Sequence, residues 1–259
     1  MVLGFLEKMQ RKLILPQAFK SLLLIFNAKK DINCITQFEF NDRGIELCCM
    51  DPYHTTQLIC QIKAQTPNNI PSFVCATSIS LEEEHLRTLN QLLKTHTTPL
   101  VIQFGSNTDI QFLDANKGIL FLALPHCVDT CLQRFPTQLD EKCIIKYLAH
   151  DFVTTLLNLC VASAIIEIWL NIDSTLHFHA SCDVGSIHVS KQLQDTPISQ
   201  PHKLQLIIKH VKTLSMLLER VTHFNLHFPL PDQTDQSLNM SFRLDSFTSG
   251  VFSLPPFVF

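Results

Sequence analysis

Residues 149–182 read AHDFVTTLLNLCVASAIIEIWLNIDSTLHFHASC and predict a helix followed by two strands. Apolar periodicity places the helix over 149–162, and its polar positions are Asp151, Thr154, Thr155 and Asn158. The strands alternate apolar with polar residues, and the apolar ones are Ile166, Ile168, Leu170 and Ile172, then Leu176, Phe178, Ala180 and Cys182. His177 and His179 therefore lie on the opposite, solvent-facing side of the second strand. Such a stretch indicates a helix packed on an antiparallel sheet.

The pattern extends on both sides of this stretch. We expect a strand over 142–148, a strand at Ile187 and Val189, a helix over 209–222, and strands over 224–230, 236–244 and 250–258. About 130 residues earlier a similar order is predicted. It comprises a helix over 16–29, strands over 33–40, 43–50, 55–63 and 73–78, a helix that Ser80 caps and that runs to Lys94, and strands over 99–104, 109–115 and 118–124. Residue identity between the halves is negligible, so an internal duplication of an α+β unit is predicted from pattern alone.

Composition excludes several classes of protein. The 259 residues are 46% hydrophobic, and a net charge of −3 gives no overall attraction to nucleic acid, so DNA contact requires basic residues gathered on one surface. The six glycines form no phosphate-binding loop. The first residues are charged unlike a secretory signal, and no apolar run reaches the roughly 20 residues of a membrane span. We therefore expect an intracellular protein whose ten cysteines are reduced, with Cys49 and Cys60 in apolar strands.

Three stretches resemble motifs of one family. Residues 44–54 read GIELCCMDPYH, residues 178–190 read FHASCDVGSIHVS, and residues 254–256 read LPP. They resemble, in order and position, motifs of the proliferating cell nuclear antigen group of sliding clamps, as a divergent viral member would. The resemblance implies the DNA clamp fold, in which two similar domains each have two helices packed on antiparallel sheets. The domains would be 1–126 and 142–259, joined by a connector over 127–141.

The family's function implies a DNA polymerase processivity factor, not an enzyme, that encircles or cradles duplex DNA without a cofactor. Basic residues on the helices would meet the phosphates, and the candidates are Lys12, Lys20, Arg87, Lys94, Lys209, Lys212 and Arg220. Ordinary solvated faces of amphipathic helices explain the same residues equally simply. The helix over 149–162 departs from the family pattern, since its polar positions carry no arginine.

The resemblance also implies a pocket for short peptide motifs of polymerases and other partners. The matching positions are Met50, Thr55, Leu58, Leu132, Phe135, Pro136, Leu254, Pro255 and Pro256. Thr55 is more polar than is usual in the family. The alternative is that these residues belong to the plain apolar core.

Several assemblies are compatible with the family. A homotrimer is expected ahead of a dimer or monomer, with strands near 118–125 and 186–191 pairing between subunits, in the nucleus or a viral replication compartment. A checkpoint-clamp subunit, or an interaction scaffold that kept the fold without sliding on DNA, is the alternative.

Metal and catalytic sites have weaker support. Cys127 and Cys131, or His177 and His179 with Cys182, are the best candidate metal ligands, but neither set has a second pair at zinc-finger spacing. No nucleophile elbow, HExxH helix or paired-carboxylate motif occurs. Cysteine–histidine catalysis stays open, because its partners need to meet only in space.

Overall fold

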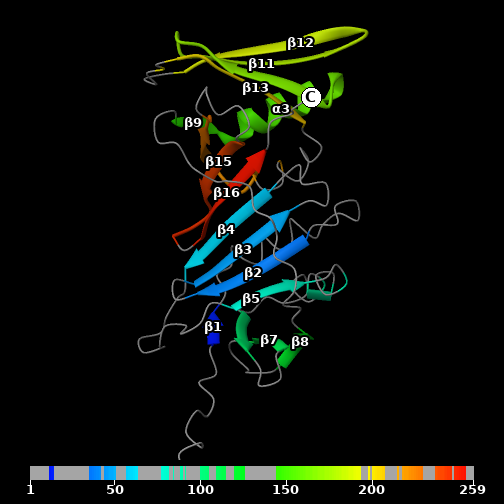
Figure 1. The fold of residues 1–259 in the computed structure, drawn as a ribbon, viewed down its shortest axis with the longest axis vertical. Coiled ribbons are helices and arrows are strands. Elements are labelled where there is room, and N and C mark those ends of the chain that lie inside the picture. Colours follow the sequence, from blue (N-terminus) through cyan, green and yellow to red (C-terminus); the bar gives the residue numbers. More distant parts are fainter. Residues whose placement is uncertain are drawn as a thin grey trace, which may run out of the picture. The chain divides into compact units, whose positions relative to one another are not determined.

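Figure 1 shows the computed structural model of residues 1–259. The structure describes residues 12–14, 35–41, 44–50, 57–63, 77–81, 84, 88, 89, 91, 100–104, 109–114, 120–125, 144–193, 198, 200–207, 215, 218–229, 237–246 and 248–254. They fall into two compact units, one mainly of residues up to 132 and the other mainly of residues from 133. The predicted connector over 127–141 lies outside the described residues.

Two sets of strands form the first unit. One set has the order β1-β6-β7-β8, all antiparallel, and its members are β1 (Lys12–Ile14), β6 (Leu100–Phe104), β7 (Asp109–Asp114) and β8 (Leu120–Pro125). The other has the order β5-β2-β3-β4, and its members are β5 (Thr77–Leu81), β2 (Ile35–Asn41), β3 (Gly44–Met50) and β4 (Gln57–Lys63). In β3, Ile45, Leu47 and Cys49 are buried as their alternation predicts, and Cys48 is buried as well.

The second unit also has two sets of antiparallel strands. One has the order β9-β14-β15-β16, and its members are β9 (Ile144–Leu148), β14 (His223–His227), β15 (Leu238–Arg243) and β16 (Thr248–Leu254). The other has the order β12-β11-β10-β13, and its members are β12 (Gly185–Gln192), β11 (Thr175–Cys182), β10 (Ile165–Leu170) and β13 (His202–Ile207).

Helix α3 (Ala149–Ala162) packs against the inner face of β10, β11 and β12 (Figure 1). Phe152, Leu156 and Leu159 recur at helical spacing and are fully buried. The helix ends at Ser163, whose backbone is extended and whose amide donates to the Leu159 carbonyl. Both ends of α3 agree with the predicted range.

Four aromatic rings form the centre of the second unit. They are Tyr147 of β9, Phe152 of α3, Phe178 of β11 and Phe224 of β14, and their centroids lie 5.0–6.4 Å apart. Most of these pairs meet edge to face, a geometry that complements the charge distribution of the rings. The cluster therefore links α3 to strands of both sheets.

The structure confirms the coarse α+β prediction, since antiparallel sheets dominate the described residues and α3 packs on one of them. Three local predictions were wrong. Ser80 lies in β5 opposite Gln37 and so does not cap a helix. Strands β1 and β13 were not predicted, and β10 ends at Leu170, which leaves Ile172 outside the strand and 63% exposed.

Removing the Phe152 ring is expected to destabilise the second unit by about 3–5 kcal/mol, because the ring is fully buried and truncation leaves a cavity. Leu157→Ala in the same helix is the control, since Leu157 is 46% exposed and its loss should cost within about 0.5 kcal/mol. Urea unfolding followed by the fluorescence of the single tryptophan, Trp169, measures both values in the same unit. Equal effects of the two substitutions would contradict this packing.

Candidate functional site

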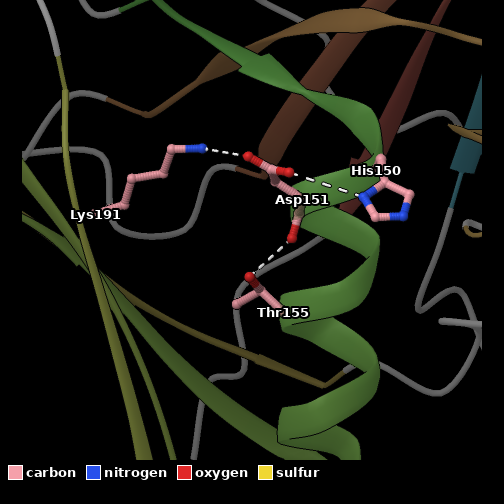
Figure 2. A network of polar contacts seen from close by, with 4 residues as sticks. All are labelled: His150, Asp151, Thr155 and Lys191. Atoms are coloured by element: carbon pink, nitrogen blue, oxygen red, sulfur yellow. Dashed lines mark hydrogen bonds and ion pairs between the residues drawn. The ribbon is translucent and has the colours of Figure 1, made fainter.

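The first turn of α3 carries a network of polar contacts that joins the helix to strand β12 (Figure 2). Lys191 Nζ lies 2.8 Å from Asp151 Oδ2, and His150 Nδ1 lies 3.8 Å from Asp151 Oδ1. Thr155 Oγ1 donates to the backbone carbonyl of Asp151 at 2.8 Å. Leu148 at the N-cap offers no side-chain hydrogen bond, so the Asp151 carboxylate supplies the negative charge that the helix N-terminus favours.

Lys191 controls the ionisation of Asp151. Its hydrogen bond and positive charge lower the pKa of the Asp151 carboxyl below the ordinary 3.8. The pair is accessible to solvent, so its role is to orient α3 against β12 and not to supply much stability. The negative charge on α3 is thereby compensated within the unit.

The same ammonium group lies 4.3 Å from the centroid of the Tyr147 ring. A cation over an aromatic face is attracted by the ring quadrupole. Burial raises the pKa of Tyr147 to about 12, and the nearby Asp151 charge acts in the same direction. The phenol therefore stays neutral at physiological pH and belongs to the core.

The outward side of α3 carries no cation. Exposed positions along it are His150, Thr154, Leu157, Asn158 and Val161, and the helix contains no Lys or Arg. Val161 is 86% exposed, so an apolar group also faces solvent. This face can make van der Waals contacts and hydrogen bonds to a partner, but it does not attract phosphates at neutral pH.

The predicted DNA contacts fall mostly outside the described residues. Lys12 lies in β1 opposite Gln103, and Arg220 is exposed in the turn after residue 218. Lys20, Arg87, Lys94, Lys209 and Lys212 are outside the described part. Their grouping on one surface stays a prediction.

The predicted peptide pocket is described at three positions. Met50, Leu58 and Leu254 are buried, with 1–2% of their surface exposed. Thr55, Leu132, Phe135, Pro136, Pro255 and Pro256 lie outside the described residues. The three described side chains contribute to an apolar core, and the pocket as a whole stays a prediction.

Cysteine chemistry is restrained by burial. Cys49 and Cys60 are buried, as their place in apolar strands predicts, and Cys48 is buried as well. Burial strongly raises the pKa of the Cys60 thiol, with a smaller contribution from Cys48. Cys60 is therefore a neutral thiol at physiological pH and a poor nucleophile.

His177 and His179 lie on the outer face of β11, as predicted, and meet residues that the sequence did not single out. His177 Nδ1 is 3.1 Å from His188 Nε2, and the Trp169 ring stacks on His177 with centroids 5.0 Å apart. Alternation within β10, β11 and β12 places the rings of Trp169, His177 and His188 on this face. Only the register of the β10–β11 and β11–β12 pairs brings them into contact. Within the described ranges, no group of three or more His, Cys, Asp or Glu side chains is arranged to hold a metal ion. Cys127 and Cys131 lie outside those ranges.

No protein-family model matches this chain, and no curated protein matches it. None of the helices in the described part is long and apolar enough to cross a membrane.

Replacing Lys191 by Met is expected to raise the pKa of Asp151 toward its ordinary value, because the neighbouring cation is removed. Since the pair lowers the folded-state pKa, its stabilising effect is present above the ordinary Asp pKa and is lost as the pH falls through the folded value. Carboxyl NMR titration measures the shift. Lys203→Met is the matched control, since Lys203 lies 3.6 Å from Glu167 and not beside Asp151. An Asp151 pKa that is the same in both variants would rule out the network of Figure 2.

Proposed function

We propose that this chain is a sliding-clamp-type DNA polymerase processivity factor, which holds a replicative polymerase on duplex DNA and catalyses no reaction. The motifs at 44–54, 178–190 and 254–256 first suggest it. The observation that carries it is the strand order of the two units.

The strand orders of the two units correspond under a shift of eight in strand number, and this correspondence supports the proposal. The order β1-β6-β7-β8 corresponds to β9-β14-β15-β16, and β5-β2-β3-β4 corresponds to β13-β10-β11-β12. Corresponding strands begin 132 residues apart at Lys12 and Ile144, and 128 residues apart at Leu120 and Thr248. Eight strands in the same order in both units are hard to reach by chance, and duplication of one ancestral unit accounts for them. Clamps of the proposed family are built from two such units.

The charges on α3 limit where DNA could contact the protein. A sliding protein must attract the phosphate backbone without reading bases. Helix α3 supplies no cation, and its Asp151 is compensated by Lys191. The attraction would therefore come from the basic residues outside α3, for which the candidates are Lys12, Lys20, Arg87, Lys94, Lys209, Lys212 and Arg220.

Strand edges support self-association. In the described part of the chain, β8 and β12 each pair along one side only. An unpaired edge offers backbone donors and acceptors to a second chain. Pairing of β8 in one copy with β12 in the next is a head-to-tail contact, and it closes into a ring if the rotation permits. A homotrimer is the assembly we propose.

A second candidate is a checkpoint-type subunit or scaffold that kept the fold and lost sliding. The observation in its favour is the outward face of α3, which has no lysine or arginine. Such a protein would not depend on its remaining cations for activity, and this separates the two candidates.

Primer extension on a long template with the cognate replicative polymerase tests the proposed function. Adding the protein is expected to lengthen the products, and reversing Lys209, Lys212 and Arg220 to Glu is expected to shorten them again. The salt dependence of DNA association should become shallower by about 0.9 in slope for each phosphate that the variant no longer neutralises. Lys146→Glu is the control, because Lys146 is an exposed cation on strand β9 and is not among the candidate DNA contacts. Unchanged product length on adding the protein defeats the clamp proposal, and unchanged activity of the triple variant favours the scaffold.

Light scattering after size exclusion tests the assembly at micromolar concentration. A mass near three times 29.5 kDa is expected. A single-chain mass at every concentration would remove the homotrimer, because the edges of β8 and β12 would then be unused.

A further inference from the structure

The outer face of the sheet β12-β11-β10-β13 carries a cluster of three nearly parallel rings. Trp169 of β10 lies 5.0 Å from His177 and 5.5 Å from His188, measured between centroids, and the ring planes diverge by only 11–13°. The centroids of His177 and His188 lie 5.3 Å apart with nearly parallel planes, and their ring nitrogens approach to 3.1 Å. The three rings therefore form a triangular cluster contributed by three strands, on the face opposite α3, in which the indole is parallel to both imidazoles.

A cavity of about 360 Å³ borders this cluster at Trp169. It is lined by Glu167, Trp169 and Asn171 of the β10 segment and by Pro201, His202 and Lys203 at the start of β13. Trp169 pairs with His177 on one side and with Lys203 on the other. Since His177 stacks against Trp169 from the β11 side, the cavity opens on the β13 side of the indole. A flat group placed there would lie against the indole of Trp169 on the side away from His177.

The cavity is lined by one cation and one anion, and Lys203 is the group that can hold an anionic part of a ligand. The Glu167 carboxylate accepts a hydrogen bond from Gln205 at 2.7 Å and lies 3.5 Å from His179 and 3.6 Å from Lys203. Its pKa is lowered, chiefly by the Gln205 hydrogen bond, so the group is ionised but compensated. Lys203 is 64% exposed, which leaves its ammonium accessible to a ligand. A purely cationic ligand would meet Lys203 unfavourably.

We propose that this cavity binds a nucleotide, with its base stacked on Trp169 and its phosphate held by Lys203. Every base has a π-face that can stack on an aromatic side chain, so stacking on Trp169 supplies affinity with little sequence preference. Each carboxylate oxygen has two lone pairs, so Glu167 can still accept from an exocyclic amino group of the base. Pockets of roughly 300 Å³ and upward hold small ligands, and this cavity is at the low end, suited to one nucleotide.

This site is separate from the proposed clamp function. Duplex DNA would meet helix surfaces, whereas the cavity lies on the sheet face that α3 does not cover. Binding of a mononucleotide can therefore fail while the clamp proposal holds, and the reverse is equally true. The same base and phosphate can come from a free nucleotide or from one unit of a single strand.

Fluorescence of the full chain tests the site directly, because Trp169 is its only tryptophan. Adenosine monophosphate is expected to quench the emission saturably, and inorganic phosphate is not. Lys203→Ala should weaken binding about 3-fold or more. Lys146→Ala, which removes an exposed lysine from β9, should leave it unchanged. Calorimetry with Trp169→Ala should show a loss of about 5-fold or more, and Trp169→Phe guards against misfolding because it keeps a ring.

A short single-stranded oligoadenylate identifies the source of the nucleotide. Tighter binding of the oligonucleotide than of the monophosphate, with the same response to Lys203→Ala, assigns the site to single-stranded nucleic acid, and equal binding assigns it to free nucleotides. Absence of saturable quenching by either probe overturns the proposal. So does an affinity that Lys203→Ala leaves unchanged, or quenching by an acidic or basic peptide in place of the nucleotides.

Discussion

Contact among four aromatic rings is the interaction on which the second unit depends. Tyr147, Phe152, Phe178 and Phe224 come from a helix and from strands of both sheets, and they are buried together. Large rings bury more apolar surface than any other side chains, and edge-to-face contact adds directionality. The cluster therefore sets both the depth at which α3 packs and the separation of the two sheets.

Because this cluster occupies the inner face of β10, β11 and β12, their alternate residues must face outward. Period-two alternation puts Ile166, Ile168 and Phe178 inside and leaves Trp169, His177 and His188 outside. Packing and surface chemistry are consequently not independent. One register, fixed by the apolar core, also fixes which rings stack on the solvent side.

Local periodicity was enough to predict the parts of the fold that are local. The ends of α3 and the two faces of β11 as far as Ala180 follow from spacing alone, whereas Cys182, expected on the inner face, is exposed. Strand β13 was missed because a polar residue, His202, takes the first inward position before Leu204 and Leu206, although His202 is buried and bonded to the Pro229 carbonyl. Ser80 was misplaced because a serine before acidic residues is typical of a helix start, whereas here the pairing of β5 with β2 takes it into a strand.

The candidate site was less predictable, because its partners are distant in sequence. Lys191 and Asp151 are 40 residues apart, and Trp169 meets His188 only through the registers of two strand pairs. Lys191 lies two and four residues after Val189 and Ile187, so strand alternation places all three side chains on the face toward α3. This spacing could have indicated the contact of Lys191 with the helix. Nothing in the spacing reveals that Glu167, Lys203 and Trp169 border one cavity.

The contact between His177 and His188 has a direction. Asn171 Nδ2 lies 3.1 Å from His177 Nε2, and an amide nitrogen can only donate, so neutral His177 accepts at Nε2 and carries its hydrogen on Nδ1. That hydrogen points to His188 Nε2, 3.1 Å away, which must then accept, so the hydrogen of neutral His188 lies on Nδ1. The Asn171 amide thus determines the tautomers of both imidazoles. A proton added at His188 Nε2 would reverse the direction of both hydrogen bonds, the one to His177 and the one to Asn171.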